Sequence, residues 1–300
     1  MRVDVSEVKA FKHCKRQWQL SSRNKFHLRP KVTPAAFATG TLFHESLHSL
    51  YLNVPLEKVM ENVKKEANEN DACLFAMIPG YARNVLPGDM ERFTVLDIEH
   101  KFTIEPVEGL DIQICGSIDM ICVENGTNKI YGFEHKTAKN FRDTSFLWMD
   151  EQPRIYTVAL KQYVEEINER RHTEWQKAGA NPQEEPVAFT LGGIYINEVK
   201  KLLRDFKYQR TLCTYPEDDL QNFFDSFFNT CCAIKYAVDK NTFATPSPSY
   251  FNCSMCDYRG VCETYMYSNI SKEEILDEFS EELMEREIDH LDEKVEREAK

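Results

Sequence analysis

Three consecutive segments rich in β-branched and aromatic residues, separated by short polar connections, constrain this chain most strongly. Phe93–Ile104, Asp111–Val123 and Lys129–His135 have the composition and alternation of strands. Between the last two lies Glu124-Asn125-Gly126-Thr127-Asn128, and an Asn-Gly pair in this position is a strong hairpin signal. We therefore expect two adjacent antiparallel strands near the middle of the chain.

Helical patterns flank these strands on both sides. The alternation of helices and strands predicts an α/β chain of mixed α+β type, in which helices flank a central mixed β-sheet. The further elements that we expect are helices over 4–20, 35–53, 56–86 (with a break at Pro79-Gly80), 148–175, 216–239 and 271–300, and a strand over 187–197.

The charge of the chain is unevenly distributed. The net charge is −12, but residues 272–300 alone carry thirteen acidic and five basic residues, which leaves only −4 for the rest. Residues 1–34 hold nine Lys or Arg against two acids. This basic segment, with aromatic residues among its charges, is suited to a nucleic-acid backbone, although a solvated basic helix would have the same composition.

The second strand and the one after the hairpin carry the candidate chemistry. The first contains Gly116-Ser117-Ile118-Asp119, and the other contains Glu134-His135-Lys136. On adjacent antiparallel strands Asp119 and Glu134 can face one point, and Lys136 shares the face of Glu134 because side chains alternate with period two. Two carboxylates suit Mg²⁺ or Mn²⁺, and a lysine can orient water or offset developing charge.

This pattern resembles the PD-(D/E)XK nuclease superfamily, and in particular its RecB-type and CRISPR-associated iron–sulfur exonuclease branch. The resemblance runs from about Cys14 to Cys262. It implies that His44, in Thr39-Gly40-Thr41-Leu42-Phe43-His44-Glu45, is a metal ligand beside Asp119 and Glu134. His135 is a further candidate metal ligand. It also implies that Gln152 and Tyr156 form the Gln-x-x-x-Tyr pair that lines the active site, while Ile118 replaces the eponymous proline.

Four of the ten cysteines form a distinctive set. Cys253, Cys256 and Cys262 make a C-x₂-C-x₅-C run, and Cys14 stands alone far upstream. Cysteines in a chain without an export signal favour metal ligation over disulfides. The resemblance implies a [4Fe–4S] cluster that ties the N-terminal helix to the C-terminal end of the domain, with zinc in the same four thiolates as the alternative.

Together these features predict a metal-dependent DNA nuclease that acts on DNA ends or single strands in recombination, repair or mobile-element DNA processing. The alternative is a non-catalytic iron–sulfur or zinc DNA-binding subunit of a helicase or DNA-integration complex. No P-loop motif is present, so any unwinding would come from a helicase or recombination partner.

The organisation expected for such a nuclease is simple. We expect an iron–sulfur nuclease domain over 1–271 and an acidic C-terminal helix over 272–300, which the core can lose because every proposed ligand precedes it. No apolar run approaches the roughly 20 residues that cross a bilayer, and the N-terminus is charged where a signal peptide is apolar. We therefore expect no membrane contact and place the protein in the cytoplasm, that of the host cell if a virus encodes it.

Overall fold

A computed structural model describes most of the chain, which divides into two compact units. Unit 1 contains residues 1–33, 106–113 and 227–300, and unit 2 contains residues 34–105 and 114–226. The described residues are 1–31, 35–107, 109–178, 185–241, 244–266 and 268–286.

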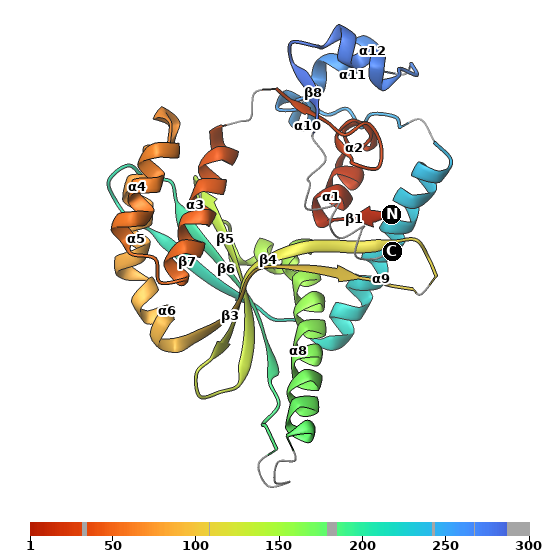
Figure 1. The fold of residues 1–300 in the computed structure, drawn as a ribbon. Helices are drawn as coiled ribbons and strands as arrows, with labels where there is room; N and C mark the ends of the chain where they lie inside the picture. Colours follow the sequence, from red (N-terminus) through yellow and green to blue (C-terminus); the bar gives the residue numbers. More distant parts are fainter. Residues whose placement is uncertain (32–34, 108, 179–184, 242–243, 267, 287–300) are drawn as a thin grey trace. The chain divides into compact units, whose positions relative to one another are not determined.

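A mixed β-sheet forms the centre of unit 2 (Figure 1). Its strands lie in the order β3-β4-β5-β6-β7, and neighbours are antiparallel except for the parallel pair β5–β6. The expected fold class, an α/β chain with a central mixed sheet flanked by helices, is confirmed. β7 has no counterpart among the expected elements. The bounds are Phe93–Ile104 (β3), Gln113–Glu124 (β4), Lys129–Ala138 (β5), Thr190–Lys200 (β6) and Tyr208–Cys213 (β7).

The predicted hairpin joins β4 to β5. Met120 to Val123 pair with Phe133 to Ile130 in antiparallel register. The turn contains Gly126 and Asn128, both at positive φ (81° and 55°), which glycine and asparagine adopt more readily than other residues. The hairpin expected at the Asn-Gly pair is thus confirmed, and its register fixes which residues of the two strands share a face.

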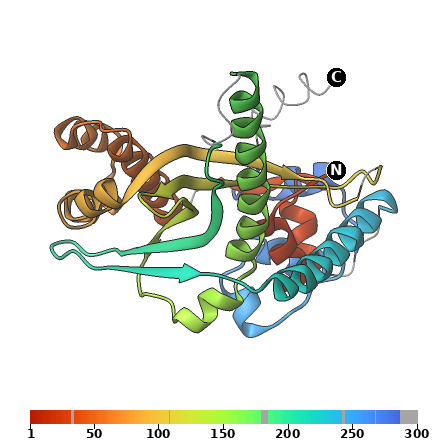
Figure 2. The ribbon, with the colours of Figure 1, turned by 90° about the horizontal axis from the view of Figure 1, so that it is seen from below.

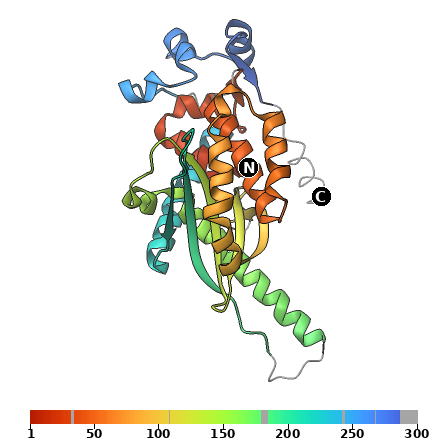
Figure 3. The ribbon, with the colours of Figure 1, turned by 90° about the vertical axis from the view of Figure 1, so that its left-hand side faces the viewer.

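Helices cover the two faces of this sheet. The core that contains Phe133 of β5 and Tyr195 of β6 is closed by α3 to α6, while Leu160 of α8 lies close to Gly132 on the other face. Figure 2 shows α8 crossing the strands, and Figure 3 shows it extending past the end of the sheet. Among the described residues, no helix has an apolar stretch that could cross a membrane. The bounds are Ala35–Tyr51 (α3), Leu56–Glu66 (α4), Leu74–Asn84 (α5), Leu86–Arg92 (α6), Thr144–Met149 (α7) and Glu151–Lys177 (α8).

Two expected helices are divided differently in the structure. The helix expected over 4–20 is two helices, because Cys14 has extended backbone angles (φ −156°, ψ 112°) between them. The helix expected over 56–86 is interrupted by a short 3₁₀ turn at Glu69–Asp71, whereas Pro79 lies inside α5 and does not break it.

Unit 1 gathers segments from both ends of the chain. Its small core contains Leu20 and Leu28 together with Tyr258, Val261 and other residues that follow them. α9 begins in unit 2 and ends in unit 1. The bounds are Arg2–Val3 (β1), Val5–His13 (α1), Lys15–Ser21 (α2), Leu28–Pro30 (β2), Glu217–Asp239 (α9), Tyr250–Ser254 (α10), Arg259–Tyr265 (α11), Lys272–Glu278 (α12) and Leu283–Glu285 (β8).

The acidic C-terminal segment is not one helix in its described part. After the short helix α12, the strand β8 pairs antiparallel with β2. Ile275 and Leu283 are both buried in the core of unit 1. Residues 287–300 lie outside the described residues, and the domain boundary at residue 271 stays a prediction. The expectation that the core can lose this segment conflicts with the burial of these two side chains.

Leu283→Ala should therefore destabilise unit 1. Removal of a fully buried leucine side chain typically costs about 2–5 kcal/mol, since it loses transfer free energy and leaves a cavity. Chemical denaturation followed by circular dichroism measures this loss. The matched control is Met284→Ala on the same strand, where the side chain is only half-buried. Equal stability of the two variants would show that β8 contributes little to the core.

Candidate active site

The strands β4 and β5 separate where they carry the two predicted carboxylates. Their ladder ends at the pair formed by Met120 and Phe133. Beyond it, the main-chain N–H of His135 donates to Asp119 Oδ2 over 2.7 Å. A carboxylate oxygen thus replaces a strand carbonyl as the acceptor of a buried N–H, and Asp119 is held beside Glu134.

Glu134 is the most enclosed acid of the site, with 3% of its surface exposed. Its Oε1 accepts a hydrogen bond from Gln152 Nε2 over 2.9 Å and forms an ion pair with Lys136 Nζ. Burial and then the charge of Asp119 raise the pKa of Glu134 to about 7, against the opposing effect of Lys136. Glu134 Oε2 is buried with no hydrogen-bond partner among the described residues. Such an acceptor is costly, so this oxygen marks where a ligand would be stabilised.

His44 reaches the other carboxylate from α3. Its Nδ1 lies 3.4 Å from Asp119 Oδ2. Burial alone would raise the pKa of Asp119, but the hydrogen bond and charge of His44 outweigh it and the pKa falls to about 2. Burial alone would lower the pKa of His44, but the attraction of Asp119 gives a net rise. The two groups therefore stabilise each other's charged forms.

Lys136 lies two residues beyond Glu134 on β5, on the same face. Its side chain is 36% exposed, so solvent reaches the amino group despite the ion pair with Glu134. Burial alone would lower the pKa of Lys136, but the charge of Glu134 and its hydrogen bond raise it overall. The lysine is therefore a protonated cation beside the two carboxylates.

Gln152 and Tyr156 lie one turn apart at the start of α8. Asp150 caps this helix by accepting the Gln152 N–H over 3.0 Å. Gln152 Nε2 donates to Glu134 Oε1 and to Tyr156 Oη, each over 2.9 Å. The Tyr156 ring is buried and makes an edge contact with Phe102. Gln152 is thus held by the helix behind it while its amide contacts the carboxylate.

The side chain of His135 lies on the opposite face of β5 from the carboxylates. Its ring is fully buried and stacks on Tyr51, with the ring centroids 5.9 Å apart. Burial lowers its pKa to about 3, so the ring is neutral. The ring centroid of His44 lies 6.3 Å away. Among the described residues, His135 contacts a carboxylate through its main-chain N–H and not through its ring. The role of His135 as a metal ligand stays a prediction.

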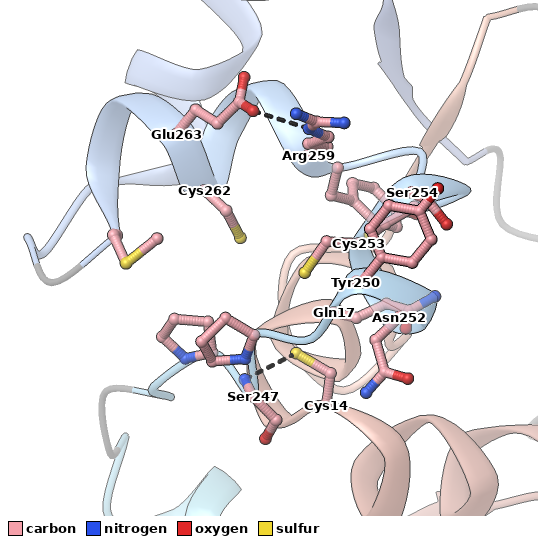
Figure 4. Close-up of a pocket in the computed structure, with 15 residues that line it drawn as sticks. Cys14, Gln17, Ser247, Tyr250, Asn252, Cys253, Ser254, Arg259, Cys262 and Glu263 are labelled. Carbon is pink, nitrogen blue, oxygen red and sulfur yellow. Dashed lines mark hydrogen bonds and ion pairs between the residues drawn. The ribbon is translucent and has the colours of Figure 1, made fainter.

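The four predicted cluster cysteines line one cavity in unit 1 (Figure 4). Its volume is about 300 Å³, and it is bordered by Cys14, Cys253, Cys256 and Cys262. The main-chain N–H of Ser247 donates to Cys14 Sγ over 3.4 Å. Burial raises the pKa of Cys256, and it raises that of Cys262 to about 11. Metal binding here would therefore release protons from thiols.

The donor types at these two places suit different metals. Carboxylate oxygens of Asp119 and Glu134, with His44, suit a hard divalent cation, and four thiolates suit iron–sulfur or zinc. In the part of the chain that the structure describes, no three His, Cys, Asp or Glu side chains are already spaced to hold a metal ion.

A family model extends over nearly the whole of this architecture. The model described as the PD-(D/E)XK nuclease superfamily matches residues 2–263. The chain belongs to the PD-(D/E)XK nuclease superfamily. The matched range includes both carboxylates, Lys136, Gln152 and all four cysteines of the cavity, so the superfamily resemblance drawn from the sequence is confirmed.

A solved structure shares the fold of this superfamily member at low sequence identity. The crystal structure described as "Putative exonuclease" from Eubacterium rectale is 13% identical to this chain in sequence. The match covers 91% of each chain, with a TM-score of 0.51. The crystal structure of SSO0001 is 12% identical and covers 88% of this chain and 86% of the other, but its TM-score of 0.37 is too low for a comparison of folds. No curated protein matches the sequence.

A buried polar network, which sequence analysis missed, supports the strand of the nuclease motif from behind. Asn197 on β6 lies beside His135, with 3.2 Å between Nδ2 and the ring Nδ1, and it donates to Tyr81 Oη over 3.1 Å. Arg210 on β7 donates to Asn197 Oδ1 over 2.6 Å. The polar Asn197 within an apolar strand was the available sequence signal.

Arg210 and Asp89 form the central ion pair of this network. Two hydrogen bonds of 2.6 and 2.7 Å join the guanidinium to the carboxylate, and Tyr51 Oη donates to the same carboxylate over 2.6 Å. Both charged side chains are largely buried. The 121 residues that separate the partners explain why no local pattern indicated the pair.

Asp89→Asn should strongly destabilise unit 2, because it leaves Arg210 as a buried charge without its counterion. Breaking a buried pair in this way typically costs about 3–5 kcal/mol. Urea denaturation measures the loss. Glu217→Gln is the matched control, since it removes the partner of Lys161 in an exposed pair and should cost under about 1 kcal/mol. Similar small losses in both variants would contradict the supporting role of the network.

Proposed function

We propose that this chain is a Mg²⁺- or Mn²⁺-dependent deoxyribonuclease that acts as an exonuclease on DNA ends or single strands. The observation that supports this most directly is the convergence of Asp119, Glu134 and Lys136 on one partly open site. The similar solved structure from Eubacterium rectale is described as "Putative exonuclease", which agrees with this proposal. We assign the chain to the RecB-type and CRISPR-associated branch, with a role in recombination, repair or mobile-element DNA processing.

The donors of the site fit a hard divalent cation. Asp119 and Glu134 supply carboxylate oxygens, which Mg²⁺ and Mn²⁺ prefer, and His44 would complete the set. A cation at the buried Glu134 Oε2 would give this oxygen a partner and lower the pKa of the acid from about 7. The bound cation would polarise the scissile phosphodiester and activate a water molecule.

The protein's own groups have separate tasks in this proposal. The Lys136 amino group, which solvent can reach, would offset charge that develops on the phosphate. Gln152 fixes the orientation of Glu134 through Oε1, and Tyr156 in turn holds the Gln152 amide. His44 keeps Asp119 ionised. The tasks of Gln152, Tyr156 and His44 use contacts that are already formed in the structure.

Glu134→Ala, Asp119→Ala and Lys136→Ala should each reduce DNA cleavage by about 10²-fold or more. Each carboxylate variant removes a ligand of the catalytic cation, and the lysine variant removes a positive charge that offsets the charge developing on the phosphate. End-labelled single-stranded and double-stranded DNA, incubated with Mg²⁺, Mn²⁺ or EDTA, provides the measurement. His44→Ala should be milder and partly rescued by Mn²⁺. EDTA should abolish the activity of the wild type.

Lys129→Ala is the control for Lys136→Ala, because Lys129 is an exposed lysine at the far end of the same strand. It should retain wild-type cleavage. Activity within about tenfold of wild type in all three site variants, or full activity in EDTA, would refute the proposed site. DNA binding without cleavage in every metal would favour the alternative, a non-catalytic subunit of a helicase or DNA-integration complex.

We further propose that Cys14, Cys253, Cys256 and Cys262 hold a [4Fe–4S] cluster. The four residues border one cavity, and the Ser247 N–H donates to Cys14 Sγ as a backbone amide would to a ligated thiolate. One lone cysteine with a trio also differs from the paired spacing of most structural zinc sites. A cluster would cross-link the N-terminal helices to the segment that follows Ser247.

Anaerobically purified protein should therefore be brown and contain about four irons per chain. Alanine at any of the four cysteines should lower the iron content and the melting temperature. The matched control is Cys232→Ala, a half-buried cysteine on α9 that lies outside the lining of the cavity and should leave the iron unchanged. Stoichiometric zinc without iron would assign the four thiolates to zinc instead.

A further inference from the structure

The short helix α7 presents large apolar side chains to solvent. Phe146, Trp148 and Met149 are 67%, 44% and 60% exposed, although all three lie within six residues. Exposing so much apolar surface in one place is unfavourable unless a partner covers it. In the chain, α7 lies between β5, which carries Glu134 and Lys136, and α8, which begins with the helical turn of Gln152.

Several contacts fix α7 in place beside the catalytic groups. Leu147 is fully buried and anchors the helix from below. The residue after α7, Asp150, caps α8 next to Gln152. Arg142, just before α7, donates to Glu198 on β6 over 2.8 Å and pairs with Asp150 over 3.4 Å. The exposed surface therefore belongs to a helix that is anchored directly before the turn that carries Gln152.

The surroundings of Trp148 combine aromatic faces with positive charge. Its ring centroid lies 5.7 Å from that of Tyr215. The Arg154 guanidinium lies 4.9 Å from the centre of the Tyr215 ring and donates to the main-chain oxygen of Trp148 over 3.3 Å. Arg154 is two residues from Gln152, so this cation and the aromatic rings lie close to the catalytic end of α8.

We propose that α7 is a stacking platform for an unpaired DNA strand, with bases on Trp148 and Phe146 and the phosphates near Arg154. The inference rests on the proposed nuclease function and names single-stranded DNA as its preferred substrate. Exposed aromatic faces beside cations bind unpaired bases without sequence preference, whereas the bases of a duplex are already stacked on one another. The position of α7 between the strand of Glu134 and the helix of Gln152 would place the stacked strand at the site of cleavage.

The test compares single-stranded and blunt double-stranded oligonucleotides for the full-length holoprotein. Phe146→Ala/Trp148→Ala should weaken binding of the single strand about tenfold or more, as loss of base stacking typically does, and leave duplex binding within about twofold. Fluorescence anisotropy in EDTA measures binding without cleavage. In Mg²⁺ the same variant should raise KM for the single strand and leave kcat within about twofold. Trp148→Phe, which keeps an aromatic face, should lose much less single-strand affinity than the double variant.

Val187→Ala is the matched control, because the Val187 side chain is also highly exposed in unit 2. Val187 lies far from the proposed site: its main-chain oxygen accepts a hydrogen bond from Arg171, which is nineteen residues beyond Gln152 on α8. This variant should bind both substrates as wild type does. Unchanged single-strand affinity in the double variant, or an equal loss on the duplex, would overturn the platform. The proposal would also be overturned if the wild-type protein were a dimer and the double variant a monomer. The patch would then be an interface with a second copy of the chain. Anisotropy measures binding even if the wild-type protein cleaves neither substrate. A failure of the nuclease proposal can therefore be distinguished from a failure of the stacking platform.

Discussion

The site depends on keeping two carboxylates close together where water hardly reaches. Burial and mutual repulsion both oppose ionisation of such a pair, and together they raise the pKa of Glu134. Asp119 is stabilised by His44 and a main-chain N–H, and Glu134 by Lys136 and Gln152. These partners come from α3, β5 and α8, so helices on both faces of the sheet must be correctly packed before the pair can exist. The fold and the site therefore form together.

The sequence indicates the parts of this arrangement whose signals are local. The Asn-Gly pair marks the hairpin, and period-two alternation then places Asp119, Glu134 and Lys136 on one side of it. Gln152 and Tyr156 are found because they lie four apart on one helix, and the Gln152 amide joins them in the structure. The C-x₂-C-x₅-C run likewise predicts neighbours in space. Each of these inferences needs only the geometry of a single strand, turn or helix.

The features that were missed have no such local signal. The strand β7 is short and polar, and it is stabilised by pairing with β6 rather than by its own pattern. The helix expected over 4–20 has continuous helical character, and only the conformation of Cys14 divides it. Asp89 and Arg210 meet across 121 residues, and β8 is a strand because β2 offers it an edge. In each case tertiary contacts override or create the local structure.

Unit 1 is built from the two ends of the chain, and this has a consequence for biosynthesis. Buried Arg16 donates to the main-chain oxygen of Tyr265 over 2.8 Å, so the first helices need the last segments to complete their packing. About 200 residues separate these parts, which at roughly 5–20 residues per second is an interval of about 10–40 s on the ribosome. During that time Leu20 and Leu28 have no core to join, and the Cys14 thiol has none of its three neighbours. The nascent N-terminal segment therefore leaves these apolar side chains and the Cys14 thiol without their native neighbours until the C-terminal segments are synthesised.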